Sequence, residues 1–202
     1  SIGQGFMLAS PMQLAVMTAR IATGRAVAPR LVRSIDGVEQ PSGAGEPLEI
    51  SATNLEYIRK AMWAVSNDRR GTAYRSRIIE DNFRMAGKTG TSQVRNITKA
   101  ERAAGVIRNE DLPWERRDHA LFVSYAPYDN PKYAIAVVVE HGGGGSKAAA
   151  PVARDIMLQA LYNGTPPLEA YPVADRERIR EQQKRLEGDR RPKARPDEKD
   201  RA

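Results

Sequence analysis

Residues 87–91 read Gly-Lys-Thr-Gly-Thr and bring one cation and two hydroxyl side chains together on five consecutive positions. A buried strand gains little from glycine at two of five positions, because glycine costs ordering entropy and has no side chain to pack. The glycines therefore predict that another group lies close to this backbone. Lys88 supplies positive charge, and Thr89 and Thr91 can hold a carboxylate. A backbone N–H beside Gly90 can donate to a developing oxyanion.

Other candidates for chemistry fit their patterns poorly. The run HGGGGSK ends at Lys147, but a phosphate-binding loop needs Gly at Ser146 and Ser or Thr at Ala148. No Gly-x-Ser-x-Gly elbow occurs. The chain has no cysteine and two histidines, which excludes thiolate chemistry and argues against a metal site. We expect no metal and no cofactor.

The net charge of +7 over 202 residues is no evidence for a nucleic-acid partner. Residues 175–202 hold 11 Lys and Arg and 8 Asp and Glu, so three of the seven charges lie in this segment. Its large apolar residues are only Ile179 and Leu186, which predicts a frayed helix followed by disorder. It lacks the interleaved aromatic residues of single-strand binders, and a weak electrostatic partner site is the alternative.

Two helices are predicted in the first third of the chain. The first begins at a Ser10 cap, with Pro11 in its first turn and Gln13 completing a capping box, and it ends at Gly24. The second runs from a Ser51 cap to about residue 66. Their predicted apolar faces are Leu14, Met17 and Ile21, and Leu55, Ile58, Met62 and Val65. Between them we expect a short strand at 28–35 and an exposed loop at 36–47.

Three strands and a closing helix are predicted after residue 82. The strands span 83–94, 119–127 and 133–140, and the short link YDNP between the last two predicts an antiparallel hairpin. A polar insertion occupies 95–118, a length typical of functional or mobile loops. The helix at 147–162 is expected to turn Val152, Ile156 and Leu161 inward. The fold class is therefore mixed α/β, with an antiparallel sheet flanked by helices.

Several stretches together resemble the transpeptidase domain of class B penicillin-binding proteins, most closely the penicillin-binding protein 2 subfamily. They are SIGQGFMLASPMQLA, GTAYR, MAGKTGTSQV, RRDHALFVSYAPYDNPKYAIAVVVEHGGGG and the closing helix. The resemblance covers residues 1–165, which we expect to be the C-terminal part of that domain. Residues 166–202 are expected to be a charged, disordered tail. Three strands of the family's five are expected here.

The resemblance implies roles for four residues. Lys88 would sustain the electrostatics and proton network around a catalytic serine, and Thr89 and Thr91 would hold the carboxylate of a substrate or β-lactam. The Thr91 N–H would donate to the oxyanion, and Gly90 would keep the strand open to the ligand backbone. Strict alternation sends Lys88 to the opposite face from the two threonines, so this arrangement needs an edge strand.

The chain contains neither the family's Ser-x-x-Lys nor its Ser-x-Asn motif. We therefore expect a truncated chain that is inactive alone, from a serine-type D,D-transpeptidase that crosslinks peptidoglycan during cell-wall elongation and determines cell shape. The implied partners are stem peptides, β-lactam antibiotics and membrane proteins of cell elongation. The implied location is the periplasmic face of the inner membrane. The alternative is a non-catalytic module that binds peptides or partner proteins.

Overall fold

The structure is a computed structural model that describes residues 8–40 and 45–190. The first residues of the resembling stretch SIGQG, part of the predicted loop and the end of the predicted tail lie outside these ranges. Within them, no helix is both long and apolar enough to cross a bilayer.

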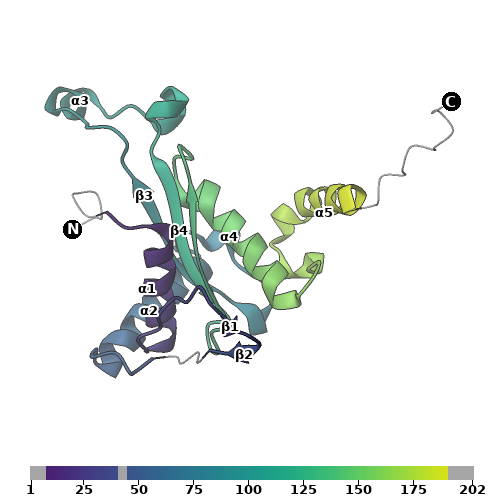
Figure 1. Ribbon diagram of the computed structural model, residues 1–202. Coiled ribbons are helices and arrows are strands. Elements are labelled where there is room, and N and C mark those ends of the chain that lie inside the picture. The colour runs from purple at the N-terminus through teal and green to yellow at the C-terminus, as the bar shows by residue number, and fades with distance from the viewer. Residues whose placement is uncertain (1–7, 41–44, 191–202) are drawn as a thin grey trace, which may run out of the picture.

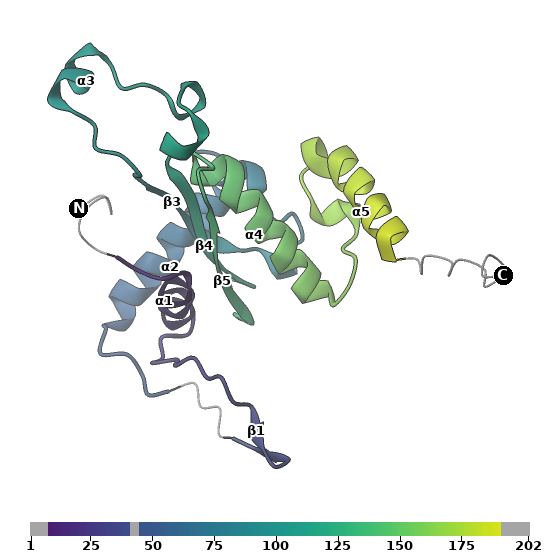
Figure 2. The same ribbon diagram turned by 45° about the horizontal axis from the view of Figure 1, so that its top comes forward.

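The helices are arranged in layers around one central sheet. α1 (Pro11–Thr23) and α2 (Ala52–Asn67) cover one face of the sheet, and α4 (Gly145–Tyr162) covers the other (Figure 1). α5 (Arg176–Arg190) lies beyond α4, on the side away from the sheet (Figure 2). This confirms the predicted mixed α/β class.

The central sheet is an antiparallel meander in the order β3-β4-β5. β3 (Ala86–Ser92) pairs with β4 (His119–Ala126), and β4 pairs with β5 (Tyr133–Val139). Phe122 lies opposite Thr89 on one side and Val137 on the other. The three predicted strands and the hairpin are confirmed, and β3 is an edge strand among the described residues.

Both predicted caps in the first third of the chain are confirmed. Ser10 Oγ accepts from Gln13 N at 3.2 Å, and Gln13 Oε1 accepts from Ser10 N at 2.8 Å. Gly24 ends α1 with a φ of 70°, and Ser51 caps α2. These features depend on residues within one helical turn, which is why the sequence predicts them well.

The predicted apolar faces of these helices are partly wrong. Met17 and Ile58 are exposed, whereas Thr18 and Ala22 are the buried residues of α1. Thr18 is accommodated because its hydroxyl donates to Leu14 O at 2.7 Å. The small side chains on this face let α1 approach the sheet closely, and apolar periodicity does not detect such a contact.

The predicted strand at 28–35 is also wrong, because only Ser34–Ile35 (β1) is extended and paired. It pairs with Val38–Glu39 (β2) in a small exposed hairpin that projects away from the sheet (Figure 2). Asp36 and Gly37 have φ values of 48° and 81°, as the tightest hairpin turns require. The dipeptide Asp-Gly was the sequence signal for this turn.

The insertion between β3 and β4 has structure of its own. It carries α3 (Lys99–Ala104), capped by Thr98, and two short 3-10 helices, Asn109–Asp111 and Trp114–Arg116. Arg95 donates two hydrogen bonds to Glu101, at 2.7 and 2.6 Å, and these bonds lower the pKa of that carboxyl below its ordinary value.

α4 turns a different face to the sheet than the apolar pattern predicts. Val152 and Ile156 are exposed, and of the three predicted residues only Leu161 packs against the core. The buried residues are Gly145, Ala149, Ala150, Ala153, Arg154, Met157 and Leu158. Alanine and glycine let the helix axis approach the strands, so the larger apolar side chains Val152 and Ile156 are left on the outer face.

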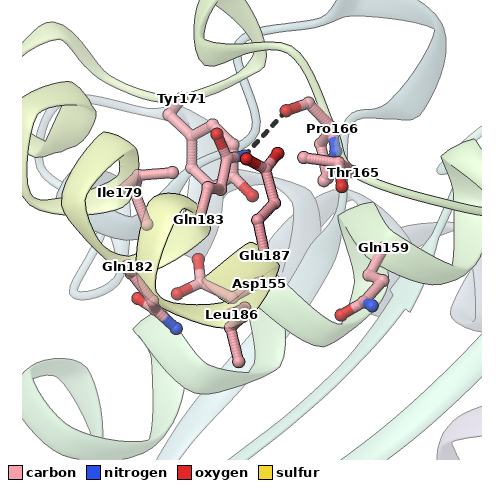
Figure 3. A pocket seen from close by; sticks show the side chains of 10 residues that line it. All are labelled: Asp155, Gln159, Thr165, Pro166, Tyr171, Ile179, Gln182, Gln183, Leu186 and Glu187. Carbon is pink, nitrogen blue, oxygen red and sulfur yellow. Dashed lines mark hydrogen bonds between the residues drawn. The ribbon is translucent and has the colours of Figure 1, made fainter. Parts of the chain in front are cut away.

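Residues 166–190 correct the expectation of a disordered tail, although the domain boundary at 165 stays a prediction. Tyr171 and Ile179 are buried and join the core cluster on the α4 side of the sheet. Figure 3 shows these two side chains lining a small pocket between α4 and α5, where Gln183 Nε2 donates to Pro166 O at 2.9 Å. The expectation of disorder was based on the apolar residues of 175–202 alone, and Tyr171, which precedes that range, supplies further apolar surface.

A buried arginine connects α4 to this C-terminal segment. The Arg154 side chain is fully buried and forms ion pairs with Asp155, at 2.8 Å, and with Asp175. Burial raises the pKa of Asp155 above its ordinary value, although Arg154 opposes the shift, and burial also raises the pKa of Tyr171 to about 12. The segment before α5 therefore docks on α4 in part through the ion pair of Asp175 with the buried Arg154.

Candidate functional site

The four residues singled out from the sequence lie together on β3. Lys88, Thr89, Gly90 and Thr91 are opposite Val123, Phe122, Leu121 and Ala120 of β4, respectively. The other side of β3 has no neighbouring strand among the described residues. An edge strand of this kind can bind an extended peptide as an additional strand.

Lys88 and the threonines lie on opposite faces of the strand but around the same edge. Phe122, opposite Thr89, packs in the core cluster that contains α4, so Thr89 is on the α4 face. Ala86, two residues before Lys88, packs with the cluster on the α1 and α2 face. The Lys88 side chain nevertheless folds against the backbone of its own strand. Its Nζ donates to the carbonyl oxygen of the next residue, Thr89, at 2.7 Å. Its ammonium therefore lies beside the backbone that carries the threonines.

Thr72 is a site residue that the sequence analysis missed. It lies in the loop after α2, and its Oγ1 is 3.0 Å from Thr89 Oγ1, close enough for a hydrogen bond. Gly71 positions the loop, since a Cβ there would lie 2.3 Å from the carbonyl oxygens of Ala64 and Val65 in α2. The sequence signal was the stretch GTAYR, which belongs to the resembling segments although its role was not assigned.

The groups that lie close to the glycines of this strand are protein groups. A Cβ on Gly87 would lie 2.4 Å from Cζ of Phe122, so the ring occupies the space that a side chain would need. A Cβ on Gly90 would lie 3.3 Å from Cβ of Leu121, and the start of α4 lies against the Gly90 backbone. A Cβ on Gly145 would lie 2.2 Å from Leu121 O and 2.6 Å from Gly90 O. The backbone of β3 is therefore held directly by α4.

The surroundings of Thr72 are positively charged. Arg69 and Arg75 come from the loop around it, and Lys147 comes from the first turn of α4. Within residues 8–40 and 45–190, no group of three or more His, Cys, Asp or Glu side chains could hold a metal ion. The arrangement is suited to attract an anion and to orient it with hydroxyl groups.

Comparison with known families identifies a match over most of the chain. Residues 1–158 match the family described as Penicillin binding protein transpeptidase domain. The match ends within α4, so the segment from residue 159 onward, including α5, lies beyond it.

Individual relatives and solved structures agree with this match. The chain is 34% identical over 197 residues to the Peptidoglycan D,D-transpeptidase MrdA of Haemophilus influenzae, covering 93% of this chain and 29% of the relative. It is 37% identical over 162 residues to the protein of the same name from Acinetobacter baumannii, covering 75% and 23%. The chain thus spans less than a third of the length of these relatives.

Two solved structures are similar to this one. One is PBP2 of Pseudomonas aeruginosa in complex with WCK 5153, with a TM-score of 0.62, 33% identity and coverage of 86% of this chain and 33% of that one. The other is PBP2 of Helicobacter pylori in complex with MreC, with a TM-score of 0.61, 35% identity and coverage of 80% and 26%.

Proposed function

Because the chain belongs to the penicillin-binding protein transpeptidase domain family, we propose that it forms the C-terminal part of the catalytic domain of a peptidoglycan D,D-transpeptidase. The whole protein would resemble penicillin-binding protein 2 and crosslink stem peptides during cell-wall elongation. The observation that carries the proposal is the Lys-Thr-Gly-Thr sequence on an edge strand, with the Lys88 ammonium 2.7 Å from Thr89 O.

The residues of β3 would bind and orient the substrate rather than attack it. An extended stem peptide would lie along the edge of β3, with its terminal carboxylate at the hydroxyls of Thr89 and Thr91. The Thr91 N–H would donate to the oxyanion that forms when the peptide carbonyl is attacked. Lys88 would contribute positive potential beside this carbonyl.

The covalent step would need a serine and a base that lie outside this chain, since no Ser-x-x-Lys motif occurs in it. The serine oxygen would form an ester with the carbonyl carbon, and the bond to the terminal residue would break. The serine proton would pass through the base to the departing amine. An amine of a second stem peptide would then displace the serine and complete the crosslink.

β-Lactams would enter the same site, as the name of the family suggests. The complex of the Helicobacter pylori protein with MreC supports a proposal that the whole protein works with other proteins of cell elongation. By the same resemblance, its place would be the periplasmic face of the inner membrane.

The test is the acylation rate of the complete protein by a fluorescent penicillin. Lys88→Ala should lower this rate on the order of 10²–10³-fold, because a preorganised charge at the reacting centre is lost. Lys132→Ala is the matched control. This exposed lysine directly precedes β5, at the end of the sheet opposite the first turn of α4. The 202-residue chain alone should form no adduct.

Near-normal acylation by the Lys88→Ala protein would remove this residue from the site, provided that its thermal stability equals that of the control. Stoichiometric labelling of a serine within residues 1–202 of the isolated chain would refute the assignment of the nucleophile to another part of the protein.

A further inference from the structure

A basic cavity adjoins the site strand. Its volume is about 310 Å³. The lining residues are Arg69, Gly71, Thr72, Tyr74, Arg75, Ser146 and Lys147. Three of them carry a positive charge, three have a hydroxyl group, and none is an Asp or a Glu. The lining comes from two segments far apart in the sequence, the loop after α2 and the first turn of α4.

The three cations of this cavity have no anionic partner in the part of the chain that the structure describes. No ion pair or side-chain hydrogen bond involves Arg69, Arg75 or Lys147 there, and all three are exposed. The contrast with the adjacent Arg70 is direct, because that side chain donates to both carboxylate oxygens of Asp68. Like charges that border one concave surface raise the local concentration of anions, so the energy of this arrangement improves when an anion binds.

The basic cavity is coupled to β3 through two contacts. Thr72 lines the cavity and lies 3.0 Å from Thr89, oxygen to oxygen. Gly145, which precedes Ser146 and Lys147, lies against the backbone of Gly90. A ligand held at the hydroxyls of β3 therefore has the basic cavity beside it, separated only by the Thr72–Thr89 pair.

We propose that the basic cavity binds a second carboxylate of the peptide that occupies β3. The preferred substrate is then an acidic peptide with at least two carboxylates, one at Thr89 and Thr91 and one among the three cations. Arginine suits this purpose because its planar guanidinium donates two parallel hydrogen bonds to a carboxylate. The proposal rests on the proposed function only in placing a peptide along β3.

The experiment compares two synthetic peptides that differ only in charge, acetyl-(D-Glu)3-D-Ala and acetyl-(D-Gln)3-D-Ala. Both end in the same carboxylate, and the three Glu residues sample several spacings of the second one. Dissociation constants of the complete protein for both peptides are measured by calorimetry at low salt, with backbone amide shifts of residues 71, 72, 146 and 147 as a local readout. We expect the Glu peptide to bind about tenfold more tightly, a difference of about 1.4 kcal/mol.

The double variant Arg69→Ser/Arg75→Ser should reduce this preference to less than about twofold, since each exposed ion pair with the second carboxylate contributes only part of it. The matched control is Arg102→Ser/Lys132→Ser, which removes the same charge from exposed side chains outside the cavity and should keep the preference. Lys147→Ser, measured separately, should weaken the preference as well, so the conclusion does not depend on the folding of one variant.

Three results would overturn the proposal. The first is equal affinity for the two peptides, and the second is an equal loss of the preference for the Glu peptide in both double variants. The third is that these residues bind inorganic pyrophosphate but do not bind the Glu peptide. None of them alters the expected loss of penicillin acylation in the Lys88→Ala protein. Conversely, normal acylation of that variant would refute the proposed function and leave the charge preference of the cavity standing.

Discussion

The contact between the start of α4 and the sheet predicts an unusual sensitivity at Gly145. In Gly145→Ala, the added Cβ would lie 2.2 Å from Leu121 O and 2.6 Å from Gly90 O, whereas ordinary contacts are 3.4–4 Å. Both neighbours are backbone atoms and cannot rotate away. α4 must therefore move outward by about 1 Å, or the strands must separate, and both responses open the core of Ala149, Ala153 and Phe122.

The size of the effect follows from opposing contributions. Overpacking of a close contact typically costs about 1–3 kcal/mol. Alanine recovers up to about 1 kcal/mol through its better helix propensity. We expect Gly145→Ala to lower the free energy of unfolding by about 1–2 kcal/mol. With a urea m-value of about 2 kcal/mol per M, the midpoint falls by up to about 1 M.

The adjacent Gly144 provides the matched control. It caps α4 with a φ of −91°, and a Cβ there would meet nothing within 4 Å. Gly144→Ala loses a favourable cap but restricts the unfolded chain, so its net effect stays within about 0.5 kcal/mol. Urea unfolding followed by far-UV circular dichroism measures both variants. Equal midpoints would show that α4 does not rest on the backbone of Gly90, and the account of how β3 is held would fail.

Two further changes probe other parts of the fold. Burial raises the pKa of Asp155, so the protonated carboxyl favours the folded state. This contribution to the free energy of unfolding is complete below the ordinary pKa of 3.8 and is lost as pH rises through the raised pKa of the folded state. Asp155→Asn should therefore gain stability relative to the parent chain across that window and then keep a constant advantage, and parallel pH curves of the melting temperature would contradict this. β5 pairs only with β4 among the described strands, so the 202-residue chain should self-associate at about 100 μM through this edge. Val138→Lys should reduce the association seen by light scattering, whereas Val173→Lys, at an exposed position outside the sheet, should not, and a stable monomer of the parent chain would contradict the expectation.

Features that depend on neighbouring residues could be predicted from the sequence. The capping box of Ser10 and Gln13, the stop at Gly24 and the hairpin of β4 and β5 all have their determinants within a few positions. The position of the Lys-Thr-Gly-Thr segment on a strand was predictable for the same reason. Strand alternation required β3 to lie at an edge of the sheet, and among the strands that the structure describes it does.

Features that depend on distant contacts could not be predicted. The buried face of α4 includes Gly145 and three alanines, which let the helix approach the strands, and an apolar pattern favours Val152 and Ile156 over such small residues. The contact of Thr72 with Thr89 joins two segments with no shared pattern. Arg154 is buried because acids from α4 and from the segment before α5 surround it, a pairing that composition alone does not reveal.

The long connection between β3 and β4 has a consequence for the order in which the sheet assembles. β4 and β5 are joined by residues 127–132, but β3 reaches β4 only through residues 93–118. Loop-closure entropy costs about 0.6 kcal/mol per doubling of loop length, so recruiting β3 costs about 1.2 kcal/mol more than closing the hairpin. We therefore expect β3 to join β4 after β4 and β5 have paired. The residues that would hold a substrate are in place only after the rest of the sheet has formed.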